Sequence, residues 1–544
     1  MLGLMTDKPL LISSLIEYAA KYHGETEIVS CNTNGSIDRS NYKKVNTRCK
    51  KLAQSLLKMG VKKGDTIGTM AWSNVRHYEL YYGVSGIGAI CHTINPRLFP
   101  EQISFIANDA NDKYLFLDAE FLPLVENLSK TLVNVKKFII MCSKDEMPSS
   151  KIIDDLICYE EMIEIESDDF SWPDFDEKTA SSLCYTSGTT GNPKGVLYAH
   201  RSTVIHSMAA AAADAMCISA RDVIMPVAPM FHANGWGIPY AATMAGAKLV
   251  LPGRNLDGES VQSLIENEQV TFTAAVPTIW LMLFEYLEKT GKKLESLNRC
   301  VIGGSACPRF MMEKFYEKYG VDVIHCWGMT ETSPIGTINR PLSKHDTTDF
   351  TKKFDLAVKQ GRPVYGVELK ITDDNGIVLP NDGKSFGNLW IRGPWICSGY
   401  LNIKNSETHG DDDWFLTGDV ATLDSDGYMQ ITDRTKDVIK SGGEWISSIE
   451  IENFAAGHPA IKEAAVIGIF HPKWDERPLL ILVKNENSEV TEEEIFTFLK
   501  DKIASWWMPN AIEFIGALPH TATGKIQKLE LREKFKDYKF EDIY

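Results

Sequence analysis

The sequence predicts an α/β protein: a large N-terminal region of layered α/β sheets with a β-rich subdomain, and a small mobile α+β domain at the C-terminus. Two observations lead to this fold class. Amphipathic helical stretches alternate with short apolar β-branched runs over most of the chain, which is typical of parallel sheets covered by helices. From about Gly361 onward, strand-like segments are instead separated by turn pairs, which favours hairpins.

The N-terminal region shows the alternation most clearly. Cys49, Leu52 and Leu56 recur at helical spacing within residues 46–59, and Gly60 is a helix-stop signal. Short apolar runs predict buried strands, and the segments between them predict helices. The expected strands are residues 65–71, 114–117, 137–141, 180–185, 248–251, 271–275 and 321–325, and the expected helices include 261–268 and 278–288.

The last third of the chain has a different pattern. Strand-like runs there are separated by Asn375-Gly376, Asp382-Gly383 and Asp426-Gly427, which are turn-forming pairs. The final part of the chain then predicts a separate small α+β domain. The expected strands are residues 367–372, 387–392, 428–432, 464–469 and 479–483, and the expected helices are 446–456 and 491–502.

Composition excludes several classes of protein. The 544 residues carry a formal net charge of −16, so a broad nucleic-acid-binding surface is not expected. No stretch approaches the roughly 20 apolar residues that span a bilayer, and the N-terminus does not resemble a targeting signal. The eleven cysteines form no CxxC pair, which indicates reduced thiols and a cytoplasmic protein.

The strongest chemical signal is the segment 185–195, YTSGTTGNPKG. Its hydroxyls and bare backbone N–H groups can surround a polyphosphate, and Lys194 adds a positive charge. A Walker A loop needs lysine followed by Ser or Thr, whereas Gly195 follows Lys194 here. The alternative is an ordinary surface loop, although such loops seldom combine this composition with Pro-Lys-Gly.

This loop resembles the signature of the adenylate-forming superfamily, which includes acyl-CoA synthetases, luciferases and peptide-synthetase adenylation domains. The superfamily's other motifs follow in the expected order, over nearly the whole chain. They match residues 229–236 (PMFHANGW), 303–306 (GGSA), 328–332 (GMTET), 417–419 (TGD), 433–437 (DRTKD), 441–447 (SGGEWIS) and 523–525 (TGK). One departure is Trp327, where the family usually has tyrosine, and an indole can stack on adenine as well.

Within the superfamily, residues 231–236, 238–243 and 443–449 resemble the fatty-acyl-CoA ligase branch. Residues 1–5 and 9–16 resemble the ligases that act on 3-methylmercaptopropionate. The resemblance implies activation of a short- to medium-chain aliphatic carboxylate, through an acyl adenylate, to its CoA thioester. ATP and CoA are the implied co-substrates and Mg²⁺ the implied cofactor.

The resemblance also implies roles for individual residues. Lys525 would be the catalytic lysine that bridges carboxylate and α-phosphate, and Glu331 with Thr186 would hold Mg²⁺. His232, Trp236 and Gly303 would line the acyl pocket. The C-terminal domain, residues 436–544, would rotate about Lys436 relative to residues 1–435, bringing Gly442, Gly443 and Trp445 to the CoA thiol. The implied ATP-binding residues are Thr186, Ser187, Gly188, Thr189, Thr190, Gly191, Lys194, Gly303, His325, Trp327, Thr330, Asp419 and Arg434.

Several alternatives stay open at this point. A long-chain fatty-acid ligase, a free-standing adenylation domain and a nucleotide-binding protein without turnover all share parts of this pattern. Taken singly, Lys525 could be a surface lysine, and Trp236 and Trp280 could be ordinary core aromatics. The expected partners are small molecules, with no nucleic acid and no membrane span, and a homodimer is left open.

Overall fold

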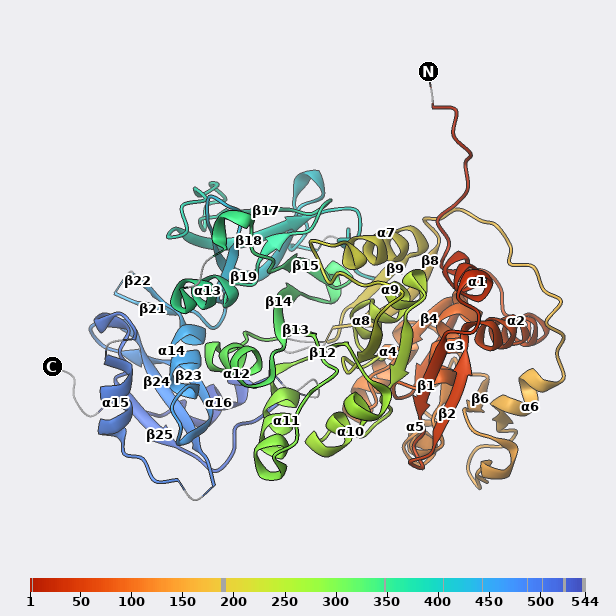
Figure 1. Cartoon of the computed structure of the whole chain (residues 1–544), viewed down its shortest axis with the longest axis horizontal. Coiled ribbons are helices and arrows are strands. Elements are labelled where there is room, and N and C mark those ends of the chain that lie inside the picture. The colour runs from red at the N-terminus through yellow and green to blue at the C-terminus, as the bar shows by residue number, and fades with distance from the viewer. Residues whose placement is uncertain are drawn as a thin grey trace.

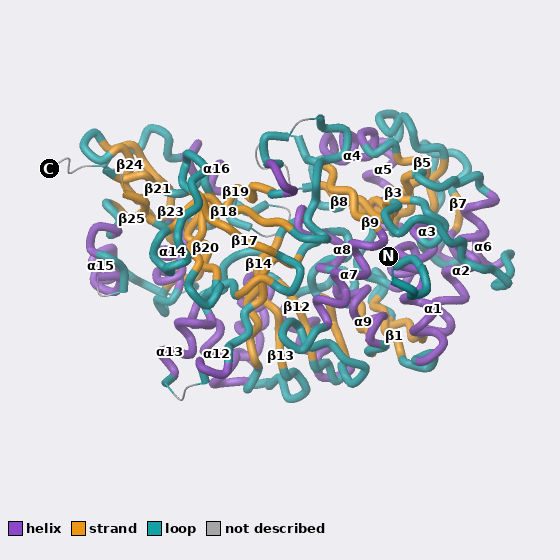
Figure 2. Tube along the Cα trace, turned by 90° about the horizontal axis from the view of Figure 1, so that it is seen from above, coloured by secondary structure: helices purple, strands orange, loops and turns teal. Residues whose placement is uncertain are grey.

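The computed structural model describes residues 1, 3–186, 192–346, 349–404, 406–442, 444–486, 488–500, 502–521 and 525–540, but not the side chains of residues 444 and 445. Figure 1 shows the C-terminal domain at one end of an elongated molecule and the first helices and strands of the N-terminal region at the other end, and the view from above in Figure 2 agrees. Among the described residues, no helix combines the length and apolarity needed to cross a bilayer.

The first large sheet has seven strands in the order β7-β6-β5-β3-β4-β8-β9. Its strands pair in parallel except for β8 and β9, which are antiparallel and are joined through residues 186–194, within the segment YTSGTTGNPKG. In that order the strands are Ile157–Cys158, Lys137–Ile140, Asp112–Leu117, Thr66–Met70, Ile90–Thr93, Ala180–Tyr185 and Gly195–Ala199.

The second large sheet has nine strands in the order β16-β15-β14-β13-β12-β10-β11-β1-β2. Its central strands are parallel, and antiparallel strands close both edges. In that order the strands are Arg362–Pro363, Ile335–Ile338, Asp322–Gly328, Arg299–Ile302, Phe272–Ala275, Val223–Pro226, Lys248–Leu251, Glu27–Cys31 and Ile37–Asn41.

Helices connect and cover the two large sheets. Helix α3 (Val75–Ser85) contacts β4 and β8 of the first sheet and β1 of the second, and α1 (Ile12–Tyr22) packs against α2, α3, α7 and α9. Their buried side chains form one continuous apolar core. The other helices of this region are α2 (Tyr42–Lys58), α4 (Pro100–Asp109), α5 (Leu122–Leu128), α6 (Tyr159–Glu164), α7 (His200–Ala211), α8 (Ala233–Trp236), α9 (Ile238–Ala245), α10 (Gly258–Glu268), α11 (Pro277–Thr290), α12 (Arg309–Tyr319) and α13 (Phe350–Ala357).

The remaining two sheets are smaller. The β-rich subdomain is an antiparallel meander of β17 (Glu368–Thr372), β18 (Phe386–Arg392), β19 (Phe415–Leu423) and β20 (Met429–Arg434). The C-terminal sheet has its own apolar cores, which supports a separate folding unit. That unit contains β21 (Ile439–Ser441), β22 (Glu444–Ile446), β23 (Ile461–His471), β24 (Asp475–Lys484), β25 (Ala511–Phe514), α14 (Ser448–Ala456), α15 (Glu492–Lys500) and α16 (Lys528–Lys534).

The predicted fold class is confirmed, and each expected helix and strand corresponds to an observed one. Boundaries differ by a few residues: α2 begins at Tyr42, because the side chain of Asn41 accepts a hydrogen bond from the Lys44 N–H and caps the helix four residues earlier than expected. Strand β19 was not expected, because Gly418 interrupts its apolar alternation.

Trp280 lies in the core. Its side chain is fully buried on α11 and meets the ring of Phe315 edge-on, with ring centroids 5.6 Å apart. Of the two readings left open for Trp280, the structure therefore supports the core aromatic.

We expect Trp280→Ala to destabilise the protein by about 3–5 kcal/mol, because it leaves a large cavity among packed side chains. Denaturant unfolding measures the change. The control is Val133→Ala, whose parent side chain is 75% exposed and whose cost should be within about 0.5 kcal/mol. A Trp280→Ala variant as stable as the control would contradict the core placement.

Candidate active site

A cavity of about 680 Å³ lies where the N-terminal region meets the C-terminal domain. One wall comes from the nine-stranded sheet, the β-rich subdomain and loops next to the seven-stranded sheet. The other comes from residues within 449–464 and from residues 520, 521 and 525–529. Several residues singled out from the sequence line it: Thr186, Lys194, His232, Trp236, Trp327, Thr330, Glu331, Arg434, Lys436 and Lys525.

A buried carboxylate marks one side of this cavity. Glu331 follows strand β14 in a short 3-10 turn, Thr330–Thr332, and the Tyr400 hydroxyl donates to its Oε1 at 2.8 Å. Burial raises the pKa of Glu331, while the Tyr400 hydrogen bond and the charges of Arg434 and Lys194 oppose that rise. The Lys194 ammonium lies 4.9 Å from the centre of the Tyr400 ring.

A second buried carboxylate, Asp419, joins three strands. Arg434 is its cross-strand partner and binds Oδ1 through Nε at 2.8 Å, and the Trp327 indole N–H donates to Oδ2 at 2.9 Å. Each carboxylate oxygen has a second lone pair, so Asp419 can still accept from hydroxyl groups. The hydrogen bond from Trp327 has no signal in the sequence, since the two residues are 92 positions apart.

Lys525 enters the cavity from the C-terminal domain. Its backbone is held by Thr521, whose N–H donates to the Lys525 carbonyl at 2.7 Å and whose hydroxyl accepts from the Lys525 N–H at 3.1 Å. Burial, and then the charge of Arg434, lower the pKa of Lys525 to about 8, against the opposing effect of Asp419 and Glu331. The structure therefore brings Lys525, Arg434 and both carboxylates together.

The apolar side of the cavity contains a strained turn that carries His232 and Trp236. Ala233, Asn234, Gly235, Trp236 and Gly237 have consecutive positive φ values of 42°, 52°, 61°, 59° and 70°. A left-handed conformation costs a non-glycine residue about 1–2 kcal/mol. Burial, and then the charge of Lys525, lower the pKa of His232 to about 4, so its ring is neutral at physiological pH.

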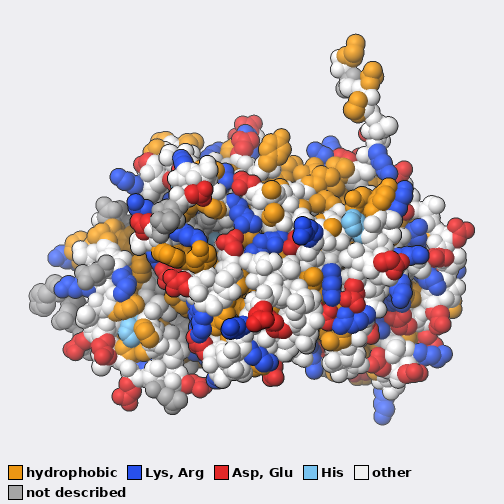
Figure 3. Space-filling model, viewed as in Figure 1, with side chains coloured by type: hydrophobic (Ala, Val, Ile, Leu, Met, Phe, Trp, Pro, Cys, Tyr) orange, Lys and Arg blue, Asp and Glu red, His pale blue; other side chains and the backbone are white. Residues whose placement is uncertain are grey.

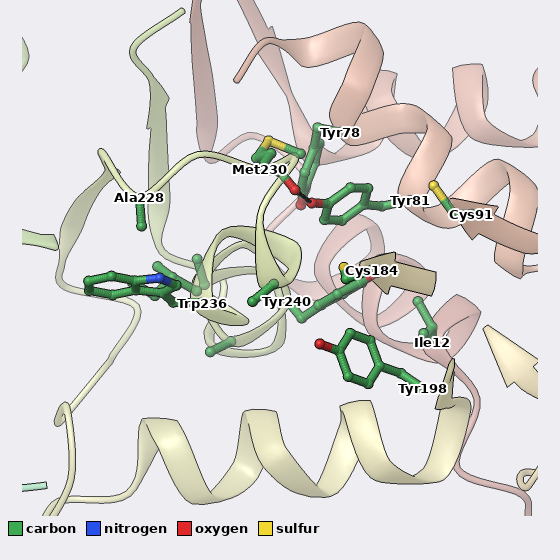
Figure 4. Close-up of a cluster of buried hydrophobic side chains, with 14 of the residues drawn as sticks. Ile12, Tyr78, Tyr81, Cys91, Cys184, Tyr198, Ala228, Met230, Trp236 and Tyr240 are labelled. Carbon is green, nitrogen blue, oxygen red and sulfur yellow. Dashed lines mark hydrogen bonds between the residues drawn. The ribbon is translucent and has the colours of Figure 1, made fainter. Parts of the chain in front are cut away.

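The Trp236 indole lies against a glycine turn. A Cβ at Gly303 would be 3.6 Å from Cη2 of this indole, and one at Gly304 would be 3.5 Å from Cζ2. Gly304 lines the cavity, whereas a Cβ at Gly303 would first meet the sulfur of Cys326 at 2.7 Å. Figure 4 shows Trp236 at the margin of the buried cluster that contains Tyr240 and Tyr81.

His325, which the resemblance assigns to the ATP site, does not line the cavity. The Cys307 N–H donates to Nε2 at 3.2 Å, and Nδ1 lies 2.9 Å from the Val358 carbonyl. Burial lowers the pKa of this histidine to about 4. Both ring nitrogens are therefore occupied by backbone groups, and the side chain is part of the core.

Gly442, the residue expected to bind CoA whose placement is described in full, does not line the cavity. Gly442 is exposed in the β21–β22 hairpin, where it has a φ of 58° and donates its N–H to the Trp474 carbonyl at 2.8 Å. The assignments of Ser187, Gly188, Thr189, Thr190, Gly191, Gly443 and the Trp445 side chain lie outside the described residues.

The cavity also contains residues that the sequence reasoning missed. Tyr400 binds Glu331, and Arg97, from the loop after β4, lines the cavity with its guanidinium 5.2 Å from the Trp72 ring centre. Neither residue belongs to a recognisable motif, so only the folded chain brings them to the site.

Comparison with known proteins identifies relatives over the whole length. The models of the AMP-binding enzyme family and of its C-terminal domain match residues 16–401 and 450–525. The chain is 54% identical over 537 residues to a 3-methylmercaptopropionyl-CoA ligase of Ruegeria lacuscaerulensis, covering 99% of each chain. It is 53% identical over 537 residues to a medium-chain-fatty-acid–CoA ligase of Ectopseudomonas oleovorans, covering 99% of this chain and 98% of the relative.

A solved structure has the same fold. The anthranilate CoA ligase AuaEII, in complex with anthranoyl-AMP, superimposes with a TM-score of 0.87 at 27% identity, covering 98% of this chain and 99% of that one.

Proposed function

The chain belongs to the AMP-binding enzyme family and is an adenylate-forming acyl-CoA ligase with ATP and CoA as substrates, and we propose that its acid is a short- to medium-chain aliphatic carboxylate such as 3-methylmercaptopropionate. The observation that carries this proposal is the Trp236 indole beside Gly304, which puts a large ring into the lining of the apolar part of the cavity. The names of the two relatives support the same class of acid.

In the proposed first step, the carboxylate attacks the α-phosphorus of ATP and pyrophosphate leaves. An anion approaches a polyanion here, so positioned cations lower the barrier. We assign this role to Lys525, with Lys194 and Arg434 also facing the cavity. Asp419 accepts from the ribose hydroxyls, and the Trp327 ring lies against adenine.

Mg²⁺ fits the oxygen donors present, since Glu331 is a buried carboxylate and Thr330 and Thr186 carry hydroxyls along the same cavity. When bound, the ion neutralises phosphate charge. Glu331 is the residue that would hold it, with Thr186 as a second oxygen ligand.

In the proposed second step, the CoA thiol attacks the acyl adenylate and AMP leaves. We place the domain boundary between residues 435 and 436, with Lys436 as the hinge about which residues 436–544 rotate. That rotation withdraws Lys525 and brings Gly442, Gly443 and Trp445 to the route of the thiol, where glycines let a thin chain pass close to the backbone.

We also propose a cytoplasmic homodimer. Leu4 and Met5 are 91% and 86% exposed on an N-terminal arm that projects from the surface in Figure 3, and a second copy of the chain could cover them. The described cysteines are free thiols, which fits a reducing compartment. Light scattering measures the oligomeric state.

Pyrophosphate release separates the alternatives. A ligase releases pyrophosphate when acid and ATP are mixed and forms the thioester only with CoA, whereas a nucleotide-binding protein without turnover releases none. A panel of acids assayed for AMP formation with CoA present then identifies the substrate.

Lys525→Ala should slow adenylate formation about 10²- to 10³-fold, because a positioned charge is removed from the developing negative charge. Thioester formation from a pre-made acyl adenylate should survive, since the lysine has then rotated away. Both half-reactions are measured separately, with Lys534→Ala, an exposed lysine of the same domain, as the control. Equal loss in both half-reactions would contradict the assigned role.

The rate of adenylate formation should fall at alkaline pH. The pKa of Lys525 is about 8 in the free enzyme, so the ammonium is present below that pH and is lost above it. The measurement is kcat/KM for the acid against pH, expected to be level below about pH 8 and to fall tenfold per unit above it. Lys525→Arg, which stays charged, should lack this decline, and a wild-type profile level to pH 10 would argue against lysine as the cation.

Trp236→Ala should move the preferred acid to longer chains. In the wild type, each methylene added to the acid should stabilise the bound acid by about 0.8 kcal/mol, which raises kcat/KM about fourfold, as long as the longer chain still fits the pocket. Trp280→Ala is the matched control, because it removes a buried indole outside the cavity and should leave the chain-length profile unchanged. A wild-type profile that rises steadily through long-chain acids would replace this proposal with a long-chain ligase.

A further inference from the structure

The left-handed turn of residues 233–237 needs support from its surroundings. Non-glycine residues stay in this conformation only where neighbouring structure enforces it. There is no room for a side chain at position 237, since a Cβ on Gly237 would lie 2.6 Å from the ring of His206. The backbone conformation of the turn therefore depends on a few contacts with neighbouring residues.

Two contacts fix the segment just before the turn. The Met230 N–H donates to the Ser73 hydroxyl at 3.2 Å, and the Tyr81 hydroxyl donates to the Met230 carbonyl. Figure 4 shows Tyr81 reaching Met230 from the neighbouring helix. These hydrogen bonds fix the backbone of Met230, before the turn, but do not involve the left-handed residues themselves.

Asn234 holds the middle of the turn. Its Nδ2 donates to the Ser182 hydroxyl at 2.9 Å, and its Oδ1 accepts from the Cys184 thiol at 3.5 Å. All three side chains are at most 5% exposed. Ser182 and Cys184 are two positions apart on β8 and so present the same face of the strand.

The position of Asn234 links two parts of the site. The turn follows β10 of the nine-stranded sheet, whereas β8 belongs to the seven-stranded sheet and leads directly into Thr186. His232 and Trp236 lie two residues to either side of Asn234 and line the cavity, while Asn234 faces β8. Asparagine is also among the few non-glycine residues that adopt positive φ readily.

We propose that Asn234 is a positioning residue for the acid substrate. The hydrogen bonds between its side-chain amide and β8 set the left-handed turn and thereby hold the Trp236 indole where it closes the acyl site. This inference rests on the proposed function, because it presumes that the acyl chain ends at Trp236. Asn234 acts through the turn and does not touch the acid.

The variants separate the effect of the Asn234 side-chain hydrogen bonds from the effect of backbone strain. Asn234→Gly removes both bonds while keeping positive φ accessible, and Asn234→Ala removes them and adds strain. Ser182→Ala removes one acceptor from the opposite side and leaves the turn sequence intact. Asn339→Gly is the matched control, since Asn339 is also buried and donates to two backbone carbonyls at 2.7 Å, those of Leu356 and Lys359.

Steady-state kinetics are measured first for the wild type over a panel of straight-chain and thioether acids. For Asn234→Gly we expect the KM of the preferred acid to rise about tenfold, the KM of ATP to stay within about twofold, and the chain-length preference to flatten. Ser182→Ala should change the same quantities in the same direction by a smaller factor. Asn339→Gly should lower the unfolding temperature and leave the chain-length preference as it is.

An Asn234→Gly variant with the wild-type acid KM and chain-length preference would overturn the inference, as would a fall in kcat common to all acids at constant KM. If the variants at position 234 do not fold, an unchanged acid KM in folded Ser182→Ala overturns it. A wild type that activates none of the acids rejects the proposed function itself, so the two failures are distinguishable.

Discussion

The ion pair between Asp419 and Arg434 is the interaction on which the arrangement of the site depends. Asp419 is 2% exposed, so its charge requires partners inside the protein. Arg434 supplies one from the end of β20, and the Trp327 indole supplies a hydrogen bond from β14. One carboxylate thereby fixes the β-rich subdomain to the nine-stranded sheet, and its partner Arg434 lies two residues before Lys436.

The position of Arg434 affects other charged groups in the cavity. Its guanidinium lowers the pKa of Lys525 and opposes the rise in the pKa of Glu331 that burial causes. Burial of the Glu331 carboxylate makes such interactions stronger than between two groups at the surface. Two carboxylates and several cations from different segments thus balance one another in a site suited to a polyanionic substrate.

The C-terminal domain is held in the arrangement that the proposed adenylation step requires. The Ser448 N–H, at the start of α14, donates to Asp433 Oδ2 at 2.8 Å, and the Ser447 hydroxyl donates to the Thr432 carbonyl. With these contacts formed, Lys525 lines the cavity and the hairpin of Gly442 does not.

The sequence by itself determined the fold class, the family and many of the residues at the cavity, because their motifs are contiguous: residues 229–236, 328–332 and 433–437 each supply lining residues. Only the tertiary structure decided that His325 is a core residue and that Tyr400 reaches Glu331, since both facts depend on groups distant in sequence. It also decided the left-handed path of residues 233–237, because a strained turn is set by contacts such as those of Asn234 with Ser182 and not by the local preferences of its residues. Periodicity and motif report local conformation and local chemistry, whereas long-range hydrogen bonds and burial select which side chains face the cavity.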